Sequence, residues 1–384
     1  MPRNDRPNAR ANDPKALERL FRTSDDLLSL WIAEPYVPLA PGIVDALQSR
    51  AQREWYGYEV RPPDTIGAFW EWAVTRHGWD GHDLHTSVSP SIGTSIALLL
   101  EDLTDPGDGV ILQPPVFTEF KPTVVKAGRS VVRSPLVLTD DGYHMDLNDL
   151  ESKASDPATK ALILCNPHNP VGRVWTPGEL ASAAEICARH NVFVIADEIH
   201  ADLALLPHEF TPFASTADAT GVSWAALHGP IKTFGLAGVC DTLVVTDRKD
   251  VTDRFRKRIA GIHASRNNVF SIAAFEAGYR TGAEWLDGFL DLVSRNMALL
   301  RAGLPDGIDL VEPEGTYLAW LDFRDLEMDV PELARWLPQS AGLALSPGHW
   351  FGREGAGFAR MTIATPPTDI EAALNRLVGA TATL

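Results

Sequence analysis

Short apolar runs that alternate with helical stretches constrain the fold of this chain more than any other feature. Amphipathic stretches such as PGELASAAEICARH (177–190) separate the runs, and Pro, Gly or Asp residues bound them. Runs of this length, spaced by helices, are typical of parallel strands whose two faces are both covered by helices. The central part of the chain is therefore predicted to be an α/β domain, with strands at GVILQ (109–113), ALILC (161–165), VFVIADE (192–198) and DTLVVTD (241–247).

The sequence pattern changes after about residue 285. A long amphipathic segment leads into two strand-like pieces, TYLAWLDF (316–323) and GFARMTIAT (357–365), and then into a closing helix. A chain of 384 residues is long enough for two domains. We predict an N-terminal arm and joining segment at 1–40, a large domain at 41–285 and a smaller α+β domain at 286–384. The first dozen residues, rich in Arg, Asn, Asp and Pro, are expected to form a loose arm.

The charge of the chain limits its partners. Its 51 acidic and 34 basic residues give a formal net charge of −17, which repels the phosphates of nucleic acids and anionic membrane surfaces. No apolar stretch approaches the roughly 18 residues of a membrane helix, and the polar start, MPRNDRPNARANDPK, has no signal-peptide core. We therefore expect a cytoplasmic protein with no nucleic-acid partner and no membrane partner.

The cysteines give no sign of a disulfide framework or a metal site. Cys165, Cys187 and Cys240 form no CxxC pair and lie in apolar or helical contexts. We interpret them as reduced core residues, with a reactive thiol as the alternative, and we expect no bound metal.

Residues suited to ligand binding lie near the ends of predicted strands, where open α/β sheets place their ligands. In SPSIGTSIALLL (89–100), Ile92, Gly93 and Thr94 open a helical run. Backbone N–H groups at a helix start, together with a threonine hydroxyl, are suited to holding a phosphate. An ordinary helix cap is the alternative interpretation of this segment.

Two further motifs follow predicted strands directly. NPHNPVGRVW (166–175) contains two Asn-Pro steps and a Gly, which predict a rigid turn that presents Asn169 to a ligand; a plain strand-ending turn is the alternative. Asp197 lies at the end of a buried strand, where a carboxylate is costly unless a cation such as a protonated ring nitrogen meets it. The alternatives are that Asp197 caps the next helix and that His200 is a loop histidine.

Two cationic residues stand among apolar neighbours. Of the eight lysines, only Lys232, in HGPIKTFGLAGVC (228–240), is flanked by Pro, Ile, Phe, Gly and Leu. A desolvated amine there would have a lowered pKa and act as a nucleophile, unless the side chain reaches solvent along an apolar surface. Arg360 lies between Phe358 and Met361 in a predicted strand, and a guanidinium in such a place usually binds a carboxylate of the protein or of a substrate.

In this order, the motifs NPHNPVG, ADEIH and KTFGLAG carry a resemblance to a known family. The chain resembles the fold-type I pyridoxal-phosphate enzymes of the class I/II aminotransferase superfamily, and within it the cystathionine β-lyase-like C–S lyases of the MalY/PatB branch. The resemblance extends from about Trp31 to Ala364. It implies an α/β fold in which a large domain is built on a mostly parallel seven-stranded sheet flanked by helices and is joined by a smaller α+β domain.

The resemblance implies a role around pyridoxal 5′-phosphate for each candidate residue. Lys232 would hold the cofactor as a Schiff base and act as general base and acid, and Asp197 would keep the ring nitrogen protonated. Phe117 would stack on the ring and Asn169 would bind its phenolic oxygen. The remaining expected cofactor-binding residues are Ile92, Gly93 and Thr94 at the phosphate, His200 near the ring and, across a dimer interface, Tyr58.

The resemblance also implies how a small amino-acid substrate is held. Arg360 would bind its α-carboxylate, and Glu34 and Tyr36 of WIAEPYVP (31–38) would border the substrate pocket. Because the family builds its sites between subunits, a homodimer with shared active sites is implied. The chain departs from the family at residues 229–231, where Gly-Pro-Ile replaces SxS and a hydroxyl that usually contacts the phosphate is lost.

For the reaction, the resemblance favours α,β-elimination from a cysteine S-conjugate or a cystathionine-like amino acid, which yields a thiol, pyruvate and ammonia. Transamination is the first alternative, because it shares the early steps. Decarboxylation or oxidative deamination of a larger S-conjugated amino acid in specialised metabolism is the second. A catalytically silent regulatory domain is a third, and the presence of Lys232, Asp197 and Arg360 argues against it.

Overall fold

A seven-stranded sheet forms the centre of the larger part of the molecule. The computed structural model describes residues 9–265 and 268–384. Strand β10 is antiparallel to both of its neighbours, β2 and β9, while the other neighbouring pairs are parallel. The predicted mostly parallel sheet is therefore confirmed. In spatial order its strands are β2 (His85–Ser89), β10 (Thr242–Thr246), β9 (Trp224–His228), β8 (Phe193–Asp197), β7 (Thr159–Cys165), β3 (Gly109–Leu112) and β4 (Ser130–Arg133).

Helices cover both faces of this sheet, as its apolar strands require. Along β7, Ile163 and Cys165 pack into one apolar core, whereas Leu162 and Leu164 pack into the other. One face is covered by α4 (Ile92–Leu103), α5 (Phe120–Lys126) and α10 (Lys249–Gly261). The opposite face is covered by α6 (Leu147–Ala154), α7 (Pro177–Arg189) and α8 (Ala214–Ala217). The alternation of the two cores along one strand explains why the strands read as continuous apolar runs.

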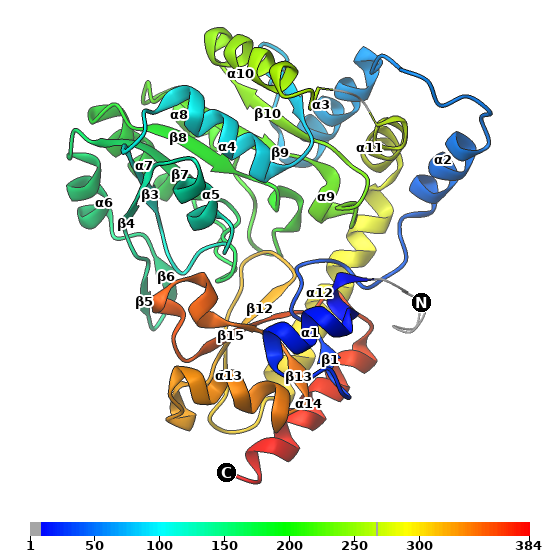
Figure 1. The fold of residues 1–384 in the computed structure, drawn as a ribbon, viewed down its shortest axis with the longest axis vertical. Helices are drawn as coiled ribbons and strands as arrows, with labels where there is room; N and C mark the ends of the chain where they lie inside the picture. The colour runs from blue at the N-terminus through cyan, green and yellow to red at the C-terminus, as the bar shows by residue number, and fades with distance from the viewer. Residues whose placement is uncertain (1–8, 266–267) are drawn as a thin grey trace.

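Helices α2 (Pro41–Ala51), α3 (Pro63–His77) and α11 (Val269–Thr281) pack together at the β2 end of the large part. Figure 1 shows them beside one another, with the long helix α12 (Ala283–Gly303) running from there toward the smaller part. The predicted boundary at residue 285 falls inside α12. The three predicted domain limits stay predictions.

The smaller part is built on a four-stranded antiparallel sheet in the order β11 (Asp309–Val311), β12 (Leu318–Asp322), β15 (Phe358–Thr362) and β14 (Ser346–Pro347). It also contains α13 (Val330–Gln339), α14 (Pro367–Thr381) and a two-stranded pair of β1 (Leu28–Ser29) with β13 (Leu343–Ala344). Short 3-10 turns complete it: η4 (Arg324–Leu326), η5 (Gly348–Phe351) and η6 (Arg353–Gly355).

The N-terminal segment packs against this smaller part. The turn η2 (Arg10–Asn12) leads into α1 (Pro14–Phe21), and the carbonyl of Ala11 accepts hydrogen bonds from the hydroxyl of Ser29 (2.5 Å) and the indole N–H of Trp31 (3.2 Å). Ala11 is completely buried. The expected loose arm is therefore wrong for residues 9–12, because these two hydrogen bonds fix the backbone; residues 1–8 lie outside the described residues.

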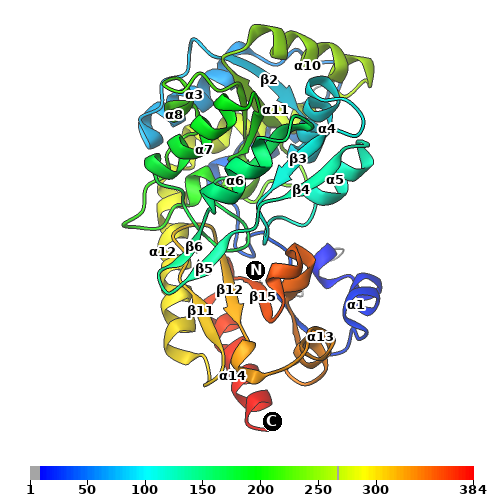
Figure 2. The ribbon, with the colours of Figure 1, turned by 90° about the vertical axis from the view of Figure 1, so that its left-hand side faces the viewer.

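The carboxyl ends of the parallel strands all open toward the smaller part. Figure 2 shows this junction, into which the hairpin of β5 (Val137–Thr139) and β6 (Gly142–His144) also reaches. Two short elements follow strands of the sheet directly: η3 (Ala201–Leu203) after β8 and α9 (Pro230–Thr233) after β9. The junction is therefore where strand-end side chains from the large part meet side chains from the smaller part.

Within the described ranges, no helix combines the length and the apolar character needed to cross a membrane. Cys165, Cys187 and Cys240 are buried and unpaired with one another. Burial raises the pKa of all three thiols, and that of Cys187 to about 12. The cysteines are therefore core residues, and the reactive-thiol alternative loses its support because the thiolate is disfavoured.

Candidate active site

Lys232 lies in the short helix α9, immediately after β9. Its ammonium group donates a 2.7 Å hydrogen bond to the carbonyl oxygen of Ala33, which belongs to the N-terminal segment. Burial lowers the pKa of Lys232 to about 8, and the nearby positive charge of Arg360 acts in the same direction, while Glu34 and Asp197 oppose it. With this pKa about a tenth of the amine is uncharged at pH 7, and that fraction can act as a nucleophile or a general base.

Asp197 ends strand β8 and is 3% exposed. Its carboxylate accepts a hydrogen bond from the amide of Ile199 at 3.2 Å, and no cationic side chain of the described residues lies within ion-pairing distance of it. Burial raises the pKa of Asp197 to about 7, against the lowering effect of the charge on Lys232. A buried carboxylate without a protein cation fits a protonated ring nitrogen of a ligand.

Arg360 reaches the junction from β15 and is 6% exposed. Its guanidinium donates to the side-chain carbonyl of Asn169 (3.0 Å), to the backbone carbonyl of Trp31 (2.8 Å) and to the hydroxyl of Ser346 (3.4 Å). All three acceptors are neutral, and Nε has no hydrogen-bond partner among the described residues. Burial lowers the pKa of Arg360 to about 10. A buried cation with neutral partners and a spare donor is suited to an anionic ligand.

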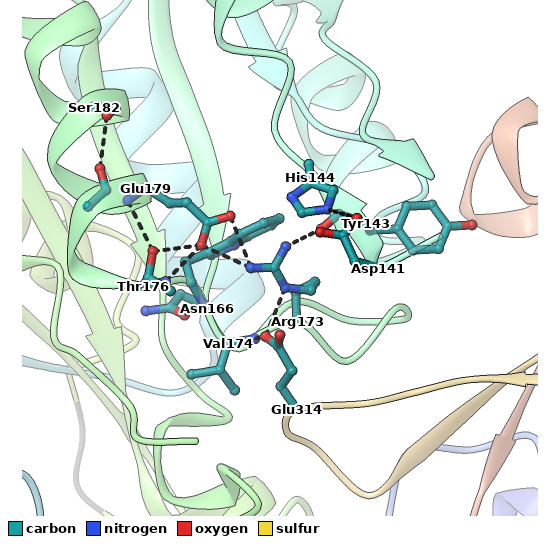
Figure 3. Close-up of polar contacts among 12 residues, drawn as sticks. Asp141, Tyr143, His144, Asn166, Arg173, Val174, Thr176, Glu179, Ser182 and Glu314 are labelled. Atoms are coloured by element: carbon teal, nitrogen blue, oxygen red, sulfur yellow. Dashed lines mark hydrogen bonds and ion pairs between the residues drawn. The ribbon is translucent and has the colours of Figure 1, made fainter. Parts of the chain in front are cut away.

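Asn169 is held in the turn after β7, where its backbone N–H donates to the sulfur of Cys165 at 3.5 Å. Arg173 fixes the far end of this turn, as Figure 3 shows. Its Nε donates to Glu314 at 2.8 Å, one terminal nitrogen donates to both oxygens of Glu179 at 3.0 and 2.9 Å, and the other donates to the carbonyl of Tyr143. Glu179 also closes a capping box with Thr176 at the start of α7. Arg173 thus joins the turn to a helix, to the β5–β6 hairpin and to the segment before β12.

Two buried carboxylates that sequence reasoning missed hold the lysine segment on either side of Lys232. Just before it, Nε2 of His228 lies 2.9 Å from a carboxylate oxygen of Glu198. Just after it, the hydroxyl of Thr233 donates to Asp202 at 2.7 Å. Asp202 also accepts from the indole of Trp72 at 2.7 Å and contacts the imidazole of His77 at 2.8 Å. Both carboxylates belong to the segment DEIHAD (197–202), which begins with the last residue of β8, so the segment that carries Asp197 also fixes the segment that carries Lys232.

His200, Glu34 and Tyr36 lie around the same point. Burial lowers the pKa of His200 well below its ordinary value, and the charges of Lys232 and Arg360 add to this effect. Nδ1 of His200 has no hydrogen-bond partner among the described residues, and its ring lies 6.1 Å from that of Tyr317. Glu34 acts electrostatically on Lys232, and Tyr36 acts on Arg360. The structure therefore brings these three residues to the predicted site.

The predicted phosphate site lies at the N-terminus of α4. Ser91 caps this helix by accepting from the amide of Thr94 at 3.1 Å. Gly93 is exposed, and a Cβ placed on it would meet no atom within 4 Å, so the space above the first turn is open. At the first of the replaced residues 229–231 the backbone packs closely, because a Cβ at Gly229 would lie only 3.2 Å from the Cα of Thr242. An open helix N-terminus is suited to a phosphate even where a neighbouring hydroxyl is lacking.

Two predicted cofactor-binding residues lie farther out. Phe117 is half-buried after β3 and packs edge-to-face on Phe120, with ring centroids 5.4 Å apart. Tyr58 is 85% exposed in the segment between α2 and α3. The other predicted groups fit pyridoxal phosphate: a lysine of lowered pKa, a buried carboxylate for the ring nitrogen and an open helix start for the phosphate.

Comparison with known proteins agrees with this geometry. The model of a family described as aminotransferase class I and II matches residues 84–377. Cystathionine beta-lyase PatB of Bacillus subtilis is 34% identical over 364 residues, and Protein MalY of Escherichia coli is 30% identical over 362 residues; each alignment covers 92% of both chains. The crystal structure of cystalysin from Treponema denticola, which contains a pyridoxal 5′-phosphate cofactor, has a TM-score of 0.88 and 28% identity, covering 94% of this chain and 92% of that one. The chain therefore belongs to the aminotransferase class I and II family.

Proposed function

We propose that this protein is a pyridoxal-phosphate-dependent C–S β-lyase that acts on a cysteine S-conjugate or a cystathionine-like amino acid. The observation that carries the proposal is that Lys232 and Asp197 meet Arg360, a buried arginine with no carboxylate partner among the described residues. An α-amino acid supplies that carboxylate. The names of the relatives support the choice of reaction, because PatB of Bacillus subtilis is a cystathionine beta-lyase and aligns over 92% of both chains.

Each residue of the site has a task in this reaction. Arg360 binds the substrate α-carboxylate through its unused Nε and the donors now bonded to neutral acceptors. Asn169 orients Arg360 from the turn after β7. When bound, pyridoxal phosphate supplies an electron sink for the pair left on Cα. Asp197 supports that sink by holding a positive charge on the ring nitrogen, and the amine of Lys232 takes the proton from Cα.

The reaction balances without an added oxidant or reductant. The Cα–H bond breaks and its proton goes to Lys232, a Cα–Cβ double bond forms, and the Cβ–S bond breaks. The sulfur leaves with the electron pair of that bond and, after protonation, is released as a thiol. Water then converts the unsaturated amino acid to pyruvate and ammonia. Lys232 is the only lysine of the site, so it both receives and returns the proton.

We propose further that the enzyme is a cytoplasmic homodimer in which Tyr58 of each subunit completes the phosphate site of the other. The support is the position of Tyr58, whose side chain is 85% exposed within its own subunit. Trp55, Tyr56 and Val60 of the same segment are also exposed, at 58%, 54% and 88%. Clustered apolar exposure of this kind is typical of a surface that binds another subunit.

The test is pyruvate release from L-cystathionine by the purified enzyme loaded with pyridoxal phosphate and given no keto acid. We expect pyruvate to accumulate over many turnovers, as followed with lactate dehydrogenase, and to be lost in Lys232→Ala. L-Norvaline, which has no leaving group on Cβ, serves as the control and should give no pyruvate. Product formation that stops after one turnover per site and resumes only on addition of a keto acid would contradict the proposal and identify a transaminase.

A further inference from the structure

A cavity of about 560 Å³ adjoins the active site at the free edge of the large sheet. It lies between α5 and β4 on one side and the η5–η6 segment of the smaller part on the other. One of its walls reaches the site, because the ring of Phe351 lies 4.8 Å from the guanidinium of Arg360. The cavity therefore begins beside the residue that we propose to bind the substrate carboxylate.

The charge of this cavity is opposite to that of the protein. Lys121, Arg133 and Arg353 line it, and its lining contains no Asp or Glu. Glu354, just outside, pairs with both Arg133 and Arg353, whereas Lys121 forms no ion pair among the described residues. The chain as a whole carries a formal charge of −17. Three cations share the single carboxylate of Glu354 there, and Lys121 is left without an ion pair, so this excess of positive charge is a local exception that favours an anionic ligand.

Much of the remaining lining is apolar and aromatic. Phe117, Trp350 and Phe351 belong to it, and Val116 donates its backbone N–H to the carbonyl of Phe351 at 3.0 Å, which holds the two sides together. A second cavity, of about 620 Å³, has no comparable excess of cations. It is lined by Asp202, Asp287 and Asp291, and its Arg76 is already paired with Asp287 at 2.6 Å. Of these two cavities, the cationic one combines aromatic walls, one of them beside Arg360, with an excess of cations.

We propose that this cavity binds the sulfur substituent of the substrate and selects substituents that end in a carboxylate or another anionic group. The proposal rests on the proposed C–S lyase function and names its substrate class. The aromatic walls contact the carbon chain attached to sulfur, and Lys121, Arg133 and Arg353 attract the terminal anion. Because these cations are partly exposed, their effect is moderate and is weakened by salt.

The test compares three cysteine S-conjugates of similar length, with a 3-carboxypropyl, a butyl or a 3-aminopropyl group on sulfur. We expect kcat/KM for pyruvate release to be about five- to tenfold higher for the carboxylate than for the butyl compound, and lowest for the amine. Lys121→Gln should reduce the carboxylate preference about twofold to threefold. The matched control is Lys126→Gln, because Lys126 is an exposed lysine of the same helix but does not line the cavity. It should leave the preference unchanged.

Calorimetric binding of the same three compounds to Lys232→Ala, which cannot remove the Cα proton, separates this proposal from the lyase function. Tightest binding of the carboxylate, without pyruvate release from any compound by the native enzyme, would support the cavity and reject the lyase reaction. Equal kcat/KM and equal affinity for all three compounds would overturn the proposal while leaving the lyase reaction intact. An equal loss of preference in Lys121→Gln and Lys126→Gln would also overturn it, because the effect would then come from overall charge.

Discussion

Two buried arginines at the junction of the large and small parts differ in the groups that accept their hydrogen bonds. Arg173 is 7% exposed and Arg360 is 6% exposed, so both guanidinium groups have lost most of their water. Arg173 uses all three of its nitrogens, and two of its partners are the carboxylates of Glu179 and Glu314. Arg360 has neutral partners and an unused Nε. The two arginines are thus equally buried, but carboxylates of the protein balance only the charge of Arg173.

The difference indicates which arginine serves the fold and which serves the ligand. A buried cation is costly unless a charge of opposite sign meets it, so the protein supplies that charge where the arginine is structural. Where the protein supplies no such charge, the free-energy cost of burying the cation falls when an anion binds. Arg360 also acts on the pKa of Lys232, whereas Arg173 does not appear among the groups that shift it. The compensated arginine therefore fixes the turn that carries Asn169, and the uncompensated one recognises substrate.

The largest expected effect is on catalysis by Arg360→Gln. The substitution removes the charge that binds the α-carboxylate, which should lower kcat/KM for L-cystathionine about 10²- to 10³-fold, the equivalent of roughly 3–4 kcal/mol. The free energy of unfolding in urea should not fall, because a buried charge without a partner is removed. Arg360→Lys should recover little activity, since an ammonium group lacks the planar fork of a guanidinium. Full activity in Arg360→Gln would show that substrate carboxylate is bound elsewhere.

The reverse result is expected for Arg173→Gln. Glu179 and Glu314 would lose their shared partner, and because both side chains are 23% exposed, water would relieve part of the cost. We expect the free energy of unfolding to fall by about 2–3 kcal/mol, with less than a tenfold change in kcat/KM. Urea denaturation followed by circular dichroism measures the first quantity. A stable Arg173→Gln variant with catalysis as poor as that of Arg360→Gln would remove the distinction between the two arginines.

A smaller effect is expected on the far side of Lys232, where Thr233 donates to Asp202. Thr233→Val keeps the shape of the side chain and removes the donor, leaving Lys232 less well positioned. We expect kcat to fall about five- to tenfold at constant KM, with a stability loss of about 1 kcal/mol. Thr233→Ser, which keeps the hydroxyl, should restore kcat. A rise in KM without a change in kcat would argue that the Asp202 contact serves substrate binding.

The smallest effect is a shift in the titration of Lys232 in the chain without cofactor. The folded pKa of about 8 lies below the ordinary lysine value of about 10.4, so the folded chain binds fewer protons between these pH values and its stability rises with pH there. Arg360→Gln should raise the pKa of Lys232, because one of the charges that lowers it is removed. Arg173→Gln should not change it. The pH dependence of the reaction of Lys232 with an amine-selective reagent measures this pKa in each variant. Identical pH profiles for the two variants would contradict the prediction.

The sequence predicted the parts of this site that depend on local pattern. Asp197, Asn169 and Lys232 each follow an apolar run, and the period of those runs predicts parallel strands whose ends meet. The apolar neighbours of Lys232 and Arg360 likewise predicted buried cations. These signals lie within a few residues of the side chain concerned, so a single sequence contains them.

The partners of the buried charges were not predictable in the same way. Arg173 and Glu314 are 141 positions apart, and Thr233 and Asp202 are 31 apart, so their pairing depends on how the chain folds. Glu198 and Asp202 had a weak signal, since both stand among buried residues close to Asp197. Gly229 was interpreted as the loss of a phosphate ligand, whereas the limited space that Thr242 leaves for a side chain at this position depends on the position of β10. The uncompensated charge of Arg360 could likewise be recognised only after its neighbours were known.

The most direct test is the affinity of S-benzyl-L-cysteine and of its α-carboxamide for Lys232→Ala, which binds these compounds without turnover. We predict by calorimetry that the carboxylate binds about 10- to 100-fold more tightly than the amide, the equivalent of a charged hydrogen bond of about 1.5–3 kcal/mol. The ratio should fall to about one when Arg360→Gln is added and should persist when Arg173→Gln is added. A ratio that survives the loss of Arg360, or disappears with the loss of Arg173, would contradict the assignment of the uncompensated arginine to the substrate.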